Sequence, residues 1–145
     1  MTIPTSLTRI IEDFQLCEGR EKVDLVVKYS EQMPELPERL ANRRETFEQV
    51  EECMTPVFVT AELQGNGLLF FFDVPAESPT VRGFSAMLAE GLNGSTPEQV
   101  LAVPHDFYQQ MGLDKVLSNQ RLNGISAILA HMKRLAAGNL SSKAS

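Results

Sequence analysis

The sequence predicts a single compact α+β domain in which a small antiparallel sheet packs against several helices. Near both ends of the chain, apolar residues recur every three or four positions, which is the spacing of amphipathic helices. Between these regions, two apolar segments within residues 57–73 flank the sequence QGNG, which is typical of a β-hairpin turn. A chain of 145 residues with 43% hydrophobic content fits one domain around one core.

Two helices are expected before the hairpin. The first follows a capping stretch at residues 4–6 and ends at Gly19. Its apolar stripe is Leu7, Ile10, Ile11 and Phe14, continued by Cys17. The second is expected over residues 20–31, because Pro34 then interrupts the pattern. Its inward residues are Val23, Val26 and Val27. Residues 41–52 have only a weak apolar stripe, so we expect an irregular approach to the hairpin.

The hairpin is expected to pair residues 57–63 with residues 68–73. Apolar and other side chains alternate in the first strand, which predicts one buried face. The alternating apolar residues are Val57, Val59, Ala61 and Leu63. The second strand contains an unbroken apolar run, residues 68–72, which predicts burial on both faces beneath helices.

Capping signals predict the helices that follow. Ser78 and Pro79 are expected to start a helix that ends at Gly91. Thr96 and Gln99 have the spacing of a capping box, which predicts a short helix. A further short helix is expected between residues 106 and 111.

The last and longest helix is expected to be capped by Ser118 and to end at Gly138. Its apolar stripe is Leu122, Ile125, Ile128, Leu129, Met132 and Leu135. Residues 139–145 are polar and lack a stripe, so we expect a disordered tail. The domain is therefore expected to comprise residues 1–138.

Composition disfavours two classes of function. The net charge is −6, and no cluster of Lys or Arg exceeds the pair Arg43–Arg44, which argues against binding nucleic acid. The longest apolar run has five residues, whereas a membrane-spanning helix needs roughly 20. The first residues include Glu12 and Asp13 and lack the apolar core of a signal peptide, so we expect a cytoplasmic protein.

Two cysteines are the candidate reactive groups. They form no C-x-x-C pair and lack zinc-site spacing, so we expect no metal site. Cys17 continues a helix stripe and is expected to be buried and inert. Cys53 lies in a loop entering a strand, where packing does not account for it and where chemistry is favoured. The residues alone make Cys53 a candidate reactive thiol and no more.

The charges near Cys53 oppose its ionisation. Glu51 and Glu52 precede it, and nearby carboxylates raise the pKa of a thiol unless a cation offsets them. Arg121, at the start of the last helix, is the expected source of that cation.

Neither histidine belongs to a catalytic or metal-binding pattern. We expect His105 and His131 to be structural or surface residues. A hydrolase built on Cys53 and His105 stays open, but no Gly-rich element precedes the cysteine to supply an oxyanion hole.

Three segments together resemble the SufE-type sulfur acceptor family, also called cysteine desulfuration proteins, over nearly the whole chain. They are VEECMTPVF at residues 50–58, TVRGF at residues 80–84 and LSNQRLNGI at residues 117–125. The corresponding family patterns are V-x-G-C-x-S-x-V-W, I-V-K-G-L and L-S-x-x-R-x-N-G-L. Glu52 replaces the family's glycine, Thr55 its serine and Phe58 its tryptophan.

The resemblance implies that Cys53 accepts sulfur. The partner would be a pyridoxal-phosphate-dependent cysteine desulfurase, which the protein would stimulate, and the sulfur would pass to an iron–sulfur scaffold complex. The chain would need no cofactor and would not be an enzyme with turnover of its own. Two other functions stay open: a thiol-based redox sensor and a partner-binding domain without chemistry. Whether the chain forms a homodimer also stays open.

Overall fold

The fold is that of a computed structural model, which describes residues 3–144, with side chains through residue 140. Within this range it contains six α-helices, three short 3-10 helices and one three-stranded antiparallel sheet, which confirms the expected α+β class. The α-helices are α1 (Thr5–Gln15), α2 (Arg20–Ser30), α3 (Glu38–Ala41), α4 (Pro79–Leu92), α5 (Pro97–Leu101) and α6 (Asn119–Ala144). The strands are β1 (Glu48–Gln49), β2 (Phe58–Gln64) and β3 (Gly67–Asp73). The 3-10 helices are η1 (Arg44–Thr46), η2 (Phe107–Gln109) and η3 (Leu113–Lys115).

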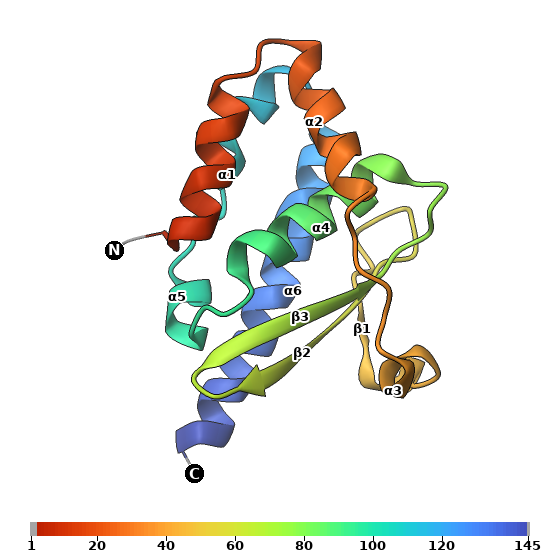
Figure 1. The fold of residues 1–145 in the computed structure, drawn as a ribbon, viewed down its shortest axis with the longest axis vertical. Helices are drawn as coiled ribbons and strands as arrows, with labels where there is room; N and C mark the ends of the chain where they lie inside the picture. Colours follow the sequence, from red (N-terminus) through yellow and green to blue (C-terminus); the bar gives the residue numbers. More distant parts are fainter. Residues whose placement is uncertain (1–2, 145) are drawn as a thin grey trace.

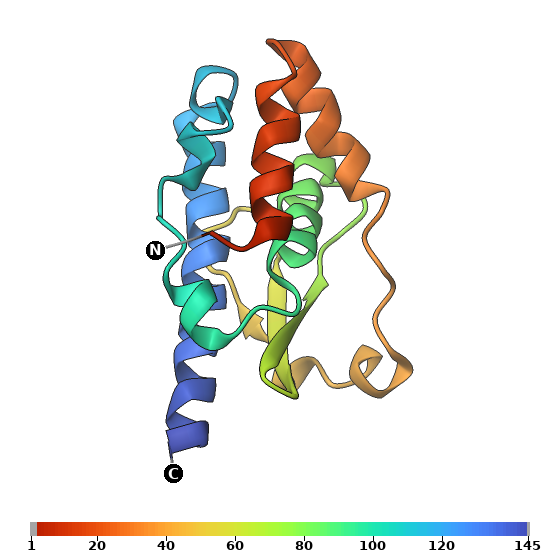
Figure 2. The same ribbon diagram turned by 60° about the vertical axis from the view of Figure 1, so that its left-hand side comes forward.

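Helix α4 lies at the centre of the helical layer. It packs against α1, α2, α6 and β3, while α1 and α2 form an antiparallel pair joined by a short turn (Figure 1). Helix α6 runs the length of the molecule and packs on β2 and α5 (Figure 2). The predicted stripe of α1 is buried as expected, because its spacing places all four side chains on the face toward α4.

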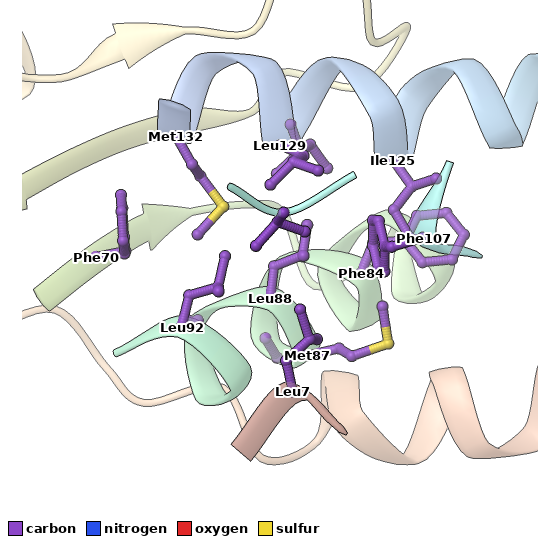
Figure 3. Close-up of a cluster of buried hydrophobic side chains, with 14 of the residues drawn as sticks. Leu7, Phe70, Phe84, Met87, Leu88, Leu92, Phe107, Ile125, Leu129 and Met132 are labelled. Atoms are coloured by element: carbon purple, nitrogen blue, oxygen red, sulfur yellow. The ribbon is translucent and has the colours of Figure 1, made fainter. Parts of the chain in front are cut away.

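The core lies between α4, α6 and the inner face of the sheet. Figure 3 shows side chains of α6 meeting those of α4, with Leu7 of α1 and Phe70 of β3 closing the cluster. The α6 side chains labelled in Figure 3 are Ile125, Leu129 and Met132, and all three are fully buried. Because α4 and α6 pack against each other, their first turns are held rigidly. Both turns line the candidate site.

The hairpin forms as predicted, and a third strand joins it. Phe58 pairs with Asp73 and Gln64 with Gly67, around a turn in which Gly65 has a φ of +63°. The unpredicted strand is β1, whose two residues pair with β2. The expectation of an irregular approach to the hairpin is therefore wrong in part, because residues 48–49 extend the sheet.

The two faces of the sheet are covered differently. Leu68, Phe70 and Phe72 are buried, while Leu69 and Phe71 between them are only half-buried. On the outer face, the guanidinium of Arg39 lies 5.8 Å from the centre of the Phe71 ring, and Arg44 lies 4.3 Å from that of Phe58. The expectation of helices on both faces is confirmed only in part, because the outer aromatic rings lie under arginine side chains of the short helical elements α3 and η1. Leu63, expected on the buried face, is 43% exposed.

Several helix boundaries differ from the expected ones. Helix α4 continues past Gly91 to Leu92, and α6 continues past Gly138 through most of the segment expected to be disordered. The domain boundary at residue 138 stays a prediction, and Ser145 lies outside the described residues. The capping box between Thr96 and Gln99 is confirmed at the start of α5.

Candidate functional site

Cys53 lies at the tip of the connection between β1 and β2, residues 50–57, which we call the Cys53 loop. The amide of Val50 donates to the carbonyl of Val57 at 2.8 Å, which closes the base of the loop. Both valine side chains are fully buried, so they anchor the loop ends in the core. At the tip, the amide of Cys53 donates to the carbonyl of Val50 at 3.2 Å. The sheet and the core thus hold a short loop that carries the thiol.

The three segments singled out in the sequence meet at one cavity. A hollow of about 380 Å³ lies between the Cys53 loop, the first turn of α4 and the first turn of α6. Thr80 and Val81 come from α4, while Gln120, Arg121 and Gly124 come from α6. Cys53 itself is part of the lining. The fold therefore brings residues more than sixty positions apart around a single thiol.

The thiol of Cys53 is half-buried and weakly hydrogen-bonded. Its Sγ donates to the carbonyl of Gly124 in α6 at 3.8 Å. Burial raises the pKa of the Cys53 thiol, and the charge of Glu52 raises it further. In this arrangement the sulfur is held mainly as a thiol and would ionise more readily if it moved toward solvent.

The loop is tied down on both sides of Cys53. On one side, the hydroxyl of Thr55 is 3.1 Å from that of Ser78, the residue that precedes α4. On the other, the carboxylate of Glu52 lies 3.0 Å from Nε2 of His131 in α6. Within the described residues only glycines have a positive φ, so Glu52 replaces the family's glycine without left-handed strain.

His131 is the site residue that the sequence did not identify. The residue is 8% exposed, and its Nδ1 contacts the carboxylate of Glu48 at the start of β1. His131 was expected to be a structural or surface residue. It is structural, and in addition it joins α6 directly to the Cys53 loop. No sequence motif marks the contact, which spans about eighty positions and depends on the tertiary fold.

Arg121 lines the same cavity as Cys53, and its expected action on the thiol stays a prediction. Its backbone amide donates to the hydroxyl of Ser118 at 3.3 Å, which confirms Ser118 as a cap of α6, and its side chain is exposed. Burial raises the pKa of Cys53 and Glu52 raises it further.

Met54, the residue after Cys53, is an exposed apolar side chain at the cavity. It is 85% exposed, and its sulfur contacts the amide of Gln120. An isolated exposed methionine is common on protein surfaces, but this one borders the thiol in the cavity lining. It would be covered by any protein that docked over Cys53.

Cys17 differs from its expected placement. It lies just beyond the end of α1 and is half-buried, so the expectation of a buried core residue is wrong. The stripe of α1 ends at Phe14 because the helix ends at Gln15, before the stripe would reach Cys17 in helical geometry. Both cysteines are free, and His105 is an exposed loop residue.

The described part of the chain offers no metal site and no membrane span. It holds no group of three or more Cys, His, Asp or Glu side chains arranged to bind a metal ion. None of its helices combines the length and the apolar character needed to cross a bilayer.

Glu52→Gln is expected to lower the pKa of Cys53, because the amide removes the neighbouring negative charge and leaves the burial in place. The rate of alkylation of Cys53 measured against pH gives this pKa as its midpoint, which should move to lower pH. Glu51→Gln is the matched control, since Glu51 is also exposed and near in sequence but does not contribute to the shift. Equal midpoints for Glu52→Gln and the unaltered protein would leave burial as the sole cause.

The fold and the site define a small α+β protein organised around one sheltered loop thiol. Residues 8–136 match the family model described as the SufE Fe-S metabolism associated domain. The chain therefore belongs to the SufE family.

Individual relatives agree with this assignment. An uncharacterized SufE-like protein of Mycobacterium tuberculosis is 38% identical over 134 residues, which is 92% of each chain. The cysteine desulfuration protein SufE of Plasmodium vivax is 28% identical over 131 residues, covering 88% of this chain and 51% of that protein. The solution structure of a hypothetical protein from Thermus thermophilus superposes with a TM-score of 0.84 at 33% identity. The match covers 97% of this chain and 99% of that one.

Proposed function

We propose that the protein is a sulfur carrier, in which Cys53 accepts sulfur from a cysteine desulfurase and passes it to iron–sulfur cluster assembly. Membership of the SufE family supports the general role in sulfur transfer. The observation that carries the assignment to Cys53 is its place at the tip of an anchored loop, in the lining of a cavity of about 380 Å³. Cys17 lines no part of that cavity.

The transfer follows the chemistry of thiol–disulfide exchange. The donor is a persulfide on the cysteine of the desulfurase, and the Cys53 thiolate attacks its terminal sulfur. A new S–S bond forms on Cys53 while the S–S bond of the donor breaks, and the donor cysteine leaves as a thiolate. The proton lost by Cys53 balances the one taken up by the leaving thiolate, so the exchange needs no added oxidant or reductant. The protein turns over no substrate by itself.

The geometry suits a carrier better than a permanently reactive thiol. A persulfide is easily reduced or oxidised, so a cavity that shelters the sulfur prolongs its life between donor and acceptor. The raised pKa of Cys53 keeps the empty carrier mainly as a thiol until a partner changes its surroundings. A cytoplasmic setting, where thiols stay reduced, fits such a carrier.

The role of sulfur carrier implies two partner proteins. A pyridoxal-phosphate-dependent cysteine desulfurase would supply the sulfur, and an iron–sulfur scaffold complex would receive it. Met54 and Arg121 lie where a desulfurase would have to approach Cys53.

The direct test is to mix the protein with a cysteine desulfurase and free cysteine and to weigh the intact chain. A mass increase of one sulfur atom, reversed by a thiol reductant and mapped to the peptide containing Cys53, is expected. A sulfur adduct on Cys17 alone, or no adduct under conditions where the desulfurase itself turns over, would contradict the proposal.

Arg121→Ala is expected to reduce sulfur transfer by about two- to fivefold, the range for one exposed ionic contact. The reason is loss of a guanidinium at the cavity that can pair with an anionic persulfide or an acidic group of the partner. The pKa of Cys53, taken from alkylation against pH, should not change, because burial and Glu52 set it. Arg9→Ala removes an arginine of α1 outside the cavity and should leave transfer intact. A changed thiol pKa in Arg121→Ala would instead show that the guanidinium supports the thiolate.

A further inference from the structure

His131 connects two glutamates that lie on either side of the start of the Cys53 loop. Its Nδ1 contacts Glu48 of β1, and its Nε2 lies 3.0 Å from Glu52, the residue before Cys53. The imidazole side chain is 10% exposed, whereas that of Glu52 is 59% exposed. A nearly buried group on the long helix α6 thus contacts a largely exposed side chain on the loop.

The chemistry of the ring limits what it can hold. A neutral imidazole carries one N–H and can donate to one carboxylate, while the imidazolium can donate to both. The other charged group facing this cluster is Arg134, whose Nε lies 3.8 Å from the carboxylate of Glu48. Among the described residues Glu48 therefore has two ion-pair partners, whereas Glu52 has His131 as its one close ion-pair partner. On this side of the thiol, the loop tip is held by the backbone bond from Cys53 to Val50 and, through a side chain, by the contact between Glu52 and His131.

A second side-chain contact also holds the loop, and the two contacts lie on either side of the thiol. Thr55 contacts Ser78 before α4, and Glu52 contacts His131 in α6. Because α4 and α6 pack against one another, these contacts fix the tip between two rigid elements. Releasing either one would let the Cys53 side chain move away from the carbonyl of Gly124.

We propose that His131 is a positioning residue that holds Cys53 in its half-buried place through the carboxylate of Glu52. This inference rests on the proposed function, since a sheltered thiol matters for a sulfur carrier. His131 does not touch the transferred sulfur; it sets how readily a reagent or a donor persulfide reaches Cys53. Loss of the contact frees the loop tip and makes the thiol more accessible, while the nucleophile itself is unchanged.

The test separates accessibility from ionisation. The rate of alkylation of Cys53 by iodoacetamide is measured against pH in a set of variants of the full chain, with Cys17→Ser as the common background. The midpoint of each profile gives the pKa of the thiol, and the plateau at high pH gives the rate of the fully ionised thiolate. Only the plateau reports access to Cys53.

Glu52→Ala and His131→Phe are each expected to raise the plateau by about two- to fivefold, the range for a partly exposed ionic contact. The double variant should be no faster than either single one, because both substitutions remove the same contact. Glu52→Gln, whose amide can still bond to Nε2, should keep a plateau near that of the parent, and Glu51→Ala should match the parent. Glu52 is exposed, so Glu52→Ala tests the inference even if His131→Phe fails to fold.

The inference is overturned if Glu52→Ala leaves the plateau unchanged, or if it raises the plateau while a folded His131→Phe does not. Additive effects in the double variant would also overturn it. Sulfur adduct formation by the unaltered protein and a desulfurase is measured in parallel. A raised plateau without any adduct would refute the carrier role and retain the positioning role, while an adduct with unchanged plateaus would do the reverse.

Discussion

Cys53→Ser is expected to fold as the unaltered protein does and to accept no sulfur. The change is nearly isosteric, and a serine hydroxyl can donate to the carbonyl of Gly124 in place of the thiol. A hydroxyl is hardly ionised at neutral pH and is a far weaker nucleophile toward sulfur than a thiolate. Stimulation of the desulfurase should therefore be lost, as measured by its conversion of cysteine to alanine at equal protein concentrations.

Cys17→Ser provides the matched control, because it removes the other half-buried cysteine away from the cavity. It should accept sulfur at the rate of the unaltered protein. Undiminished stimulation by Cys53→Ser would leave a partner-binding domain without chemistry.

The redox-sensor alternative makes a different prediction for the same variants. A sensor should be oxidised by peroxide without a desulfurase, at a thiol of lowered pKa. The surroundings of Cys53 raise its pKa, which disfavours rapid oxidation. Peroxide oxidation of Cys53 that outpaces sulfur transfer would support the sensor and contradict the carrier.

The part of the fold set by local pattern was predictable from the sequence. The alternation that includes Val57 and Val59 identified β2, and the hairpin turn fixed its pairing with β3. The capping box at Thr96 likewise depends on residues three positions apart. These features need no knowledge of distant contacts, and they are confirmed.

The features that were missed depend on contacts between distant segments. Strand β1 has only two residues, too few for a period-two pattern, and exists because β2 lies beside it. The unbroken apolar run of residues 68–72 predicted burial on both faces. It did not show that Phe71, on the outer face, is covered by Arg39, which lies far away in the sequence. An apolar pattern shows that a surface must be covered and does not show by what.

The candidate site likewise contains residues that the sequence predicted and one that it did not. Cys53 stood out in the sequence because packing did not account for it, and Arg121 lies in the same cavity as expected. The electrostatic role expected of Arg121 stays a prediction, since proximity in a cavity does not by itself place a charge beside the sulfur. His131 was missed because its contacts to Glu48 and Glu52 exist only in the folded chain.

Gly83→Ala is expected to destabilise the folded protein, because the added methyl group has no room. Gly83 lies where α4 crosses α2, and a Cβ added there would lie 2.1 Å from the carbonyl oxygen of Val26 and 2.7 Å from its Cγ1. The obstacle is backbone of a packed helix, so α2 would have to move away from α4. Overpacking costs typically about 1–3 kcal/mol, against which alanine returns about 0.5–1 kcal/mol of helix propensity. We expect a net loss of about 2 kcal/mol in the free energy of unfolding, which is near the upper end of the overpacking cost minus the gain in helix propensity.

Urea denaturation measures this loss as a lower midpoint with an unchanged slope. Gly138→Ala is the matched control, because Gly138 also lies in a helix, but an added Cβ there would meet nothing within 4 Å. This control should raise the free energy of unfolding, by at most about 1 kcal/mol, since only helix propensity changes. Both glycines thus receive the same methyl group, and opposite signs are expected because Gly83 lies at a helix crossing and Gly138 has open space around it. Equal effects of the two substitutions would show that the close approach of α2 to α4 is not what requires glycine at position 83.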